Sequence, residues 1–142
     1  MRCICCLLLA LFASRAHAQE PDAWYRTLLA ALVKGDTAAV HRMSTPDYAF
    51  VVDGHVYTQA ERLVDLAAPR DQPVISITPT CTWHRHDPVA IGVCHVLQRN
   101  AARDTMPASE WHGLTLVTLL RQGSDWRIAA NSLMEDSTSD TH

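Results

Sequence analysis

Basic residues, glycine-rich loops and long apolar segments are all in short supply in this chain of 142 residues. Lys and Arg number 12 against 15 Asp and Glu, which gives a net charge of −3 with the histidines neutral. Nucleic acids bind basic surfaces because their phosphates are negative, so this balance argues against a nucleic-acid partner. The chain also has no glycine-rich phosphate loop, no Gly-x-Ser-x-Gly motif and no Cys-His nucleophile signature. An apolar content of 48% is typical of a single domain with its own core.

The most apolar stretch lies close to the N-terminus, from Ile4 to Ala13. It is shorter than the roughly 20 residues that a membrane-spanning helix needs. Arg2 precedes it, and Ala16-His17-Ala18 follows with the small-x-small pattern that signal peptidase cleaves. We therefore predict a signal peptide over residues 1–18, cleavage after Ala18 and a periplasmic or secreted protein that makes no membrane contact once the leader is removed.

Residues 19–134 are predicted to form the single domain of the mature chain. Removal of Arg2 and Arg15 with the leader leaves 10 of the 12 basic residues against all 15 acidic ones, so the mature chain is more acidic than the whole. Residues 135–142 are mostly polar and show no periodicity, and they are predicted to form a disordered tail.

Two cysteines, Cys81 and Cys94, remain after the leader is removed, and they lie in two β-like runs at 74–85 and 89–98. A hairpin centred on Asp87-Pro88 sets Cys81 directly opposite Cys94 and Trp83 opposite Gly92. Directly opposed residues have Cα atoms about 4.5 to 5.5 Å apart, which is inside the disulfide range. We predict a structural disulfide in an oxidising compartment. The alternative is a pair of small buried thiols.

Helical periodicity predicts a helix over 22–34 that is closed by Gly35, and a shorter one that Asp36 caps and that ends before Pro46. A strand at 48–52 and its return at 55–57 flank the tight-turn dipeptide Asp53-Gly54. Thr58 and Glu61 form a capping box that opens a third helix. The strands at 74–85 and 89–98 and two more at 111–121 and 126–134 follow.

The last two strands are apolar on both faces when Arg121 pairs with Trp126. One face holds Val117, Leu119, Trp126, Ile128 and Ala130. The other holds Leu114, Leu116, Leu120 and Leu133 together with His112, Thr118 and Asn131. A sheet with one wet face would alternate cleanly between apolar and polar residues. We therefore expect one face to meet the helices and the other a second subunit, in a homodimer.

The order of elements resembles the nuclear transport factor 2-like superfamily, in particular its SnoaL-like members and its members of unknown function. The resemblance rests on Gly35-Asp36-Thr37-Ala38-Ala39, on the segment from Asp47 to Gly54, on Thr58-Gln59-Ala60-Glu61 and on Gly123-Ser124-Asp125-Trp126-Arg127-Ile128. It implies an α+β fold in which a curved antiparallel sheet is wrapped by about three N-terminal helices into a cone with a pocket at its open end. It also implies that dimers are frequent.

The resemblance further implies that the face carrying His112 is the pocket face. The pocket is then expected to be lined by Tyr48, Leu28, Leu114, Leu116, Thr118 and Asn131. Ketosteroid isomerases of this superfamily use a carboxylate base with a tyrosine and a protonated aspartate as donors. When their pattern is laid over this sequence, the base matches Asp53. The position of the tyrosine is occupied by Leu28 and that of the protonated aspartate by Thr118. Because oxyanion donors each contribute about 2.7 to 4 kcal/mol, we expect no isomerase activity of that kind.

Three functions fit these observations. The first is binding of a small, partly apolar molecule in the pocket. The second is a cofactor-independent isomerase, dehydratase or hydrolase in which Asp53 and His112 act as acid and base and Asn131 orients the substrate. Both residues also have a purely structural interpretation. Asp53 is then a turn residue, and His112 is a hydrogen-bonded residue in the wall of the pocket. The third function is that of a protein-protein accessory subunit.

No cofactor and no metal site is predicted. His84 and His86 share a strand face, at a spacing that a metal could use. The remaining residues of that face are solvated in character, and His95 falls opposite Thr80, too far along the strand to be a third ligand.

Overall fold

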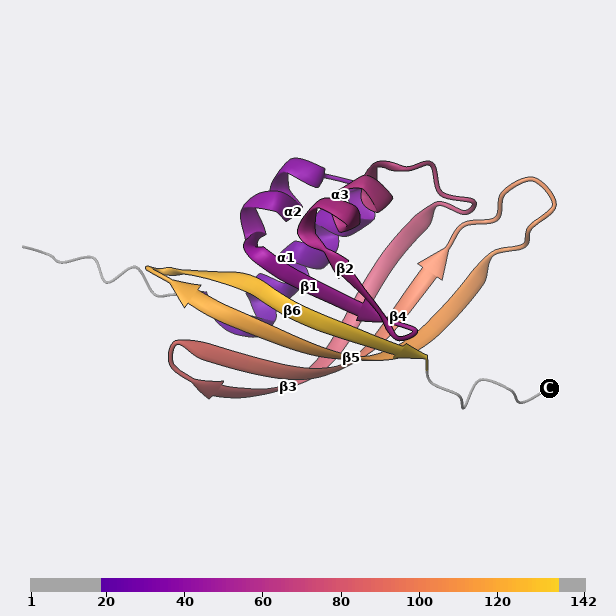
Figure 1. The fold of residues 1–142 in the computed structure, drawn as a ribbon. Helices are drawn as coiled ribbons and strands as arrows, with labels where there is room; N and C mark the ends of the chain where they lie inside the picture. Colours follow the sequence, from indigo (N-terminus) through magenta and orange to yellow (C-terminus); the bar gives the residue numbers. More distant parts are fainter. Residues whose placement is uncertain (1–18, 136–142) are drawn as a thin grey trace, which may run out of the picture.

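The computed structural model describes residues 19–135, which form one α+β domain (Figure 1). The predicted signal peptide and residues 136–142 of the predicted tail lie outside the described residues. The three helices are α1 (Pro21–Lys34), α2 (Thr37–Met43) and α3 (Gln59–Ala67). The strands are β1 (Ser44–Val52), β2 (His55–Thr58), β3 (Val74–His86), β4 (Val89–Asn100), β5 (Ser109–Gln122) and β6 (Asp125–Glu135). Glu135, which was assigned to the tail, is therefore the last residue of a strand.

The turns and caps of the N-terminal half match the prediction. Gly35 ends α1 in the left-handed conformation with φ 68°, and the Asp36 carboxylate accepts a hydrogen bond from the Ala39 amide at the start of α2. Asp53 and Gly54 both have positive φ, as a tight hairpin turn requires. The capping box of Thr58 and Glu61 is present in full at the start of α3.

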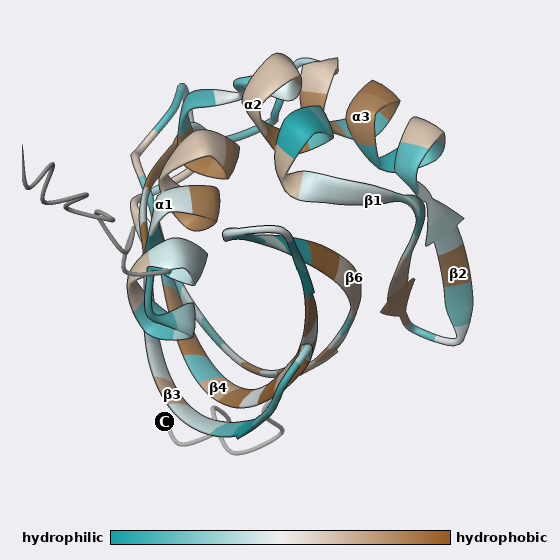
Figure 2. Cartoon of the chain, turned by 90° about the vertical axis from the view of Figure 1, so that its left-hand side faces the viewer, coloured by the Kyte–Doolittle hydropathy of each residue, from teal (hydrophilic) through white to brown (hydrophobic). Residues whose placement is uncertain are grey.

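The six strands form one sheet in the order β2-β1-β6-β5-β4-β3. All neighbours are antiparallel except β1 and β6, which are parallel. The predicted curved antiparallel sheet is therefore confirmed for every pair of neighbours except this one, which makes the sheet mixed. Figure 2 shows the long strands curling into an arc, with the helices beside its open side. The core fills the concave side, where buried residues of the three helices cluster with residues of β1, β4, β5 and β6, and α1 lies against β3.

The β3–β4 hairpin has the predicted register. Cys81 pairs with Cys94 and Trp83 with Gly92. The indole of Trp83 covers Gly92 so closely that a Cβ at that glycine would lie 2.6 Å from the ring. The two cysteine sulfurs lie within disulfide-bonding distance. Their oxidation state in the cell stays a prediction.

The β5–β6 hairpin departs from the predicted register after its first few pairs. Arg121 pairs with Trp126 as predicted, and Leu119 with Ile128, but the next pair is Thr118 with Ala130. The extra residue on β6 is a bulge, and it turns every later side chain of β6 to the opposite face. Asn131 therefore pairs with Val117 and not, as predicted, with Leu116.

The faces of β5 were assigned the wrong way round. Val117 and Leu119 are fully buried on the concave side, with Thr115 beside them. His112, Leu114, Leu116 and Thr118 alternate with these residues and point to the outer side, where His112 is exposed and Leu116 is 44% exposed. Both faces of the strand are apolar, so alternation alone does not say which one meets the helices.

Candidate ligand pocket

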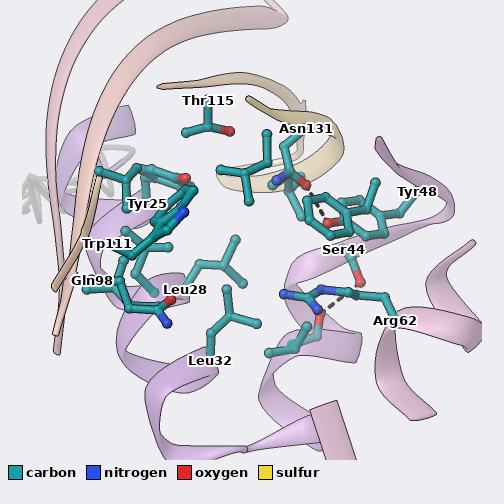
Figure 3. Close-up of a pocket in the computed structure, with 17 residues that line it drawn as sticks. Tyr25, Leu28, Leu32, Ser44, Tyr48, Arg62, Gln98, Trp111, Thr115 and Asn131 are labelled. Carbon is teal, nitrogen blue, oxygen red and sulfur yellow. Dashed lines mark hydrogen bonds between the residues drawn. The ribbon is translucent and has the colours of Figure 1, made fainter. Parts of the chain in front are cut away.

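A cavity of about 100 Å³ lies inside the cone, between the helices and the concave face of the sheet (Figure 3). A single water needs only roughly 10–15 Å³ of such space, so the cavity has room for a small organic molecule. Most of its wall is apolar or aromatic. The lining residues are Tyr25, Leu28, Leu29, Leu32, Val40, Ser44, Tyr48, Phe50, Arg62, Ile77, Val96, Gln98, Trp111, Thr115, Ile128, Asn131 and Leu133.

Three of the six residues predicted to line the pocket do line this cavity: Leu28, Tyr48 and Asn131. Asn131 reaches it only because the bulge in β6 turns its side chain inward. Leu114, Leu116 and Thr118 do not line it, because they lie on the outer face of β5. Thr118, onto which the isomerase pattern placed its second acid, is thus on the wrong side of the sheet for that role.

Asp53 and His112 do not line the cavity either. Asp53 occupies the exposed turn between β1 and β2, where its φ of 50° suits the turn. His112 is exposed on the outer face of β5. The predicted acid-base pair is therefore not brought together in the pocket, because each residue follows the local geometry of its own turn or strand.

Several cavity residues were not predicted from the sequence, above all Trp111, Thr115 and Arg62. The sequence around Gly113 groups Trp111 and Thr115 on one face of the strand. A Cβ at Gly113 would overlap the Trp111 ring, which folds along the strand over the glycine. The pattern predicts that Trp111, Gly113 and Thr115 share one face of β5, and the tertiary structure makes that face the concave one.

Two tyrosine hydroxyls enter the cavity and are held in their neutral form. Burial raises the pKa of Tyr48 to about 12, and the nearby Arg62 guanidinium offsets part of the rise. Burial, with a smaller contribution from Tyr48, raises the pKa of Tyr25 well above its ordinary value. The Tyr48 hydroxyl donates a hydrogen bond to Asn131 Oδ1, shown as a dashed line in Figure 3. Both hydroxyls are therefore available at neutral pH as uncharged hydrogen-bonding groups.

A second, more polar cleft of about 440 Å³ adjoins the cavity. The two share the side chains of Leu32, Arg62, Ile77 and Gln98, which form a neck between them. The cavity therefore borders the polar cleft along these four side chains.

Residues 19–135 contain no group of three or more His, Cys, Asp or Glu side chains placed to hold a metal ion. The helices of the same segment are also too short or too polar to cross a membrane.

No protein-family model matches the chain, and no curated protein matches it. Solved structures do match over most of its length. A protein of unknown function from Mycobacterium tuberculosis has a TM-score of 0.74 and 20% identity, over 83% of this chain and 70% of its own. An NTF2-like protein of unknown function in nutrient uptake from Rhodospirillum rubrum has a TM-score of 0.71 and 17% identity, over 83% and 99%.

The hub of the kinase CaMKII from S. rosetta is also similar, with a TM-score of 0.72 and 11% identity over 83% of this chain and 98% of the hub. At these identities the likeness concerns the fold and not the activity. The curved six-stranded sheet with three helices beside it is consistent with the match to NTF2-like structures. The chain therefore has the nuclear transport factor 2-like fold that its sequence resemblance predicted.

Proposed function

We propose that this protein binds a small, partly apolar molecule in the cavity of its cone. One observation supports the proposal above the others: an apolar cavity that contains a few polar groups pointing inward. Ligand sites typically combine a mostly apolar wall with a few polar groups that orient the ligand. Here the polar groups include Tyr48, Asn131 and Gln98, from three different elements. The acid-base pair of the enzymatic alternative, Asp53 and His112, does not line this cavity.

Native mass spectrometry of the mature protein from its own compartment tests the proposal. We expect a co-purified small molecule that leaves on denaturation. Leu32→Trp should abolish the extra mass, because a larger ring at the neck fills the cavity. Ala30→Trp is the matched control, since Ala30 is exposed on the same helix and does not line the cavity. A wild-type protein without bound ligand that also fails to bind benzamide would contradict the proposal.

A specific feature favours a second role, the formation of a homodimer through the outer face of the sheet. Ile91, Val93, Leu116 and Met134 form an outer apolar patch and are 39 to 51% exposed. Val93 and Leu116 are direct cross-strand neighbours, so the patch is continuous at its centre. Exposed apolar patches typically mark interaction surfaces. Similar solved structures include a kinase hub and a kinase association domain, and these names fit a role in assembly.

Sedimentation equilibrium tests the dimer. We expect twice the chain mass for the wild type and a monomer for Leu116→Arg, because a buried unpaired charge at an interface is costly. Val64→Arg is the control, since Val64 is 72% exposed on α3, away from the outer patch. A monomeric wild type would contradict the dimer and would leave a different protein as the partner of this face.

We also propose that the protein is exported and acts in the periplasm or outside the cell. The support is the leader pattern before Gln19 and a cysteine pair within bonding distance, which suits an oxidising compartment.

A further inference from the structure

Arg62 is the only charged side chain among the described residues that line the cavity. It projects from α3, and Figure 3 shows its guanidinium directed into the cavity. The side chain is 26% exposed, so much of it lies away from water. A buried charge is costly unless it is paired. Arg62 pairs with Asp65 at the surface, while the described residues that line the cavity include no carboxylate to face the inner side of the guanidinium. The question is therefore which anion contacts the inner side of the Arg62 guanidinium.

The contacts of Arg62 hold its guanidinium in place without occupying its cavity side. Nη1 donates to the Asp65 carboxylate one turn along α3, and that carboxylate is 63% exposed. The guanidinium also stacks on the Phe50 ring, with its centre 4.6 Å from the ring centroid. A guanidinium has five N–H donors in a planar fork. One edge meets Asp65 at the surface, and other donors remain for a ligand inside.

Neutral donors surround the same point. The Tyr48 hydroxyl lies close enough to Arg62 to be affected by its charge, and its pKa of about 12 keeps its proton in place. The amide nitrogen of Asn131 points into the cavity in Figure 3. Gln98 stands with Arg62 at the neck. The amide nitrogens of Asn131 and Gln98 each have a proton for an anion at this point, while the Tyr48 proton is donated to Asn131 Oδ1 and fixes the orientation of that amide.

We propose that the ligand is a small carboxylate with an apolar body, which deepens the proposed function and rests on it. Its carboxylate would sit at the neck against Arg62, and its apolar part would lie inward against Leu28 and Trp111. The geometry favours a single negative charge because one cation faces the cavity. A carboxylate also matches the planar fork of an arginine. The neck position leaves the charged end near the polar cleft and the apolar end in the dry interior.

Benzoate and benzamide test the proposal, because they have nearly the same shape and differ in charge. Their affinities for the mature wild-type protein can be measured by calorimetry or by ligand-observed NMR at neutral pH. We expect benzoate to bind at least about tenfold more tightly than benzamide, as charge-assisted hydrogen bonds are stronger than neutral ones. In Arg62→Met the preference should disappear while benzamide still binds. Arg62→Lys should keep part of the preference.

Asp65→Asn separates ligand binding from a structural role of Arg62. This variant breaks the same ion pair but leaves the cation, so benzoate should bind as tightly as to the wild type or more tightly. A loss in Asp65→Asn as large as that in Arg62→Met would overturn the proposal. Equal binding of both probes to the wild type would overturn it as well and leave ligand binding itself intact. Binding of neither probe would overturn the carboxylate proposal, and together with the absence of a co-purified molecule it would contradict ligand binding as well.

Discussion

Tyr48 and Tyr25 illustrate how burial alone changes the chemistry of a side chain. The family resemblance predicted Tyr48 as a pocket residue, but nothing in the sequence indicates a changed pKa for either tyrosine. In the fold, both tyrosines are buried where they line the cavity, and the pKa of each rises because the charged form loses its hydration. The same burial that makes them neutral donors at pH 7 makes the folded state sensitive to high pH.

We predict that the protein loses stability as the pH rises from about 10 to about 12. The pKa of Tyr48 is about 12 in the folded state, against 10.0 for an unperturbed tyrosine, so the folded state holds the proton more tightly. The contribution is complete below pH about 10 and falls by about 1.4 kcal/mol for each pH unit above it. Urea denaturation at several pH values measures this slope. If the free energy of unfolding of Tyr48→Phe falls with pH as steeply as that of the wild type, the loss does not come from the Tyr48 hydroxyl.

The close contact of Gly113 with Trp111 predicts that any side chain at residue 113 destabilises the folded state. Gly113→Ala should lower the free energy of unfolding by about 1 to 3 kcal/mol, because the new methyl group overlaps the indole ring. Tryptophan fluorescence should change as the ring moves. In a Trp111→Leu background the same substitution should cost much less. Similar costs in both backgrounds would mean that the ring is not what excludes the side chain.

Among the elements, the helices, turns and caps could be predicted because their signals are local. Asp36, Asp53-Gly54 and the Thr58–Glu61 box each act within a few residues of the chain. The β3–β4 register could be predicted for the same reason, since a short turn fixes which residues face each other. The bulge in β6 could not be, because it depends on how β6 fits between β5 and β1.

The hairpin register predicts how the cysteines react. In protein purified from an oxidising compartment, Cys81 and Cys94 should resist alkylation until a reductant is added. Replacing both by alanine should lower the free energy of unfolding, because the bridge constrains the unfolded chain. The expected loss is about 2 to 3 kcal/mol, since the bridge closes only a short loop. Mass spectrometry after alkylation gives the count of modified thiols. Labelling of both residues without a reductant would show that they are free thiols.

At the scale of the whole molecule, the position of the domain in the chain bears on export. The carbonyl of Gln19, the residue that follows the predicted cleavage site, accepts a hydrogen bond of 2.9 Å from the Trp126 indole. Cleavage after Ala18 would therefore leave this contact intact.

We predict that the full chain, expressed in a bacterium with a secretion pathway, is recovered from the periplasm or medium with Gln19 as its first residue. Intact-mass measurement and N-terminal sequencing identify the start. Ala16→Asp and Ala18→Asp together should block processing, because signal peptidase needs small residues there. Substitution of Ala23, an exposed residue of α1, is the control. Recovery of the uncleaved chain from the cytoplasm alone would contradict export.

The sequence by itself determined the local features: the caps, the Asp53-Gly54 turn, the pairing of Cys81 with Cys94 and the order of elements that indicates the cone. These depend on neighbours a few residues apart. The tertiary structure decided which face of β5 is inside, that Asn131 enters the cavity while His112 stays out, and that Arg62 reaches it from α3. These contacts join residues far apart in the chain, and a strand with two apolar faces carries no local signal for either side.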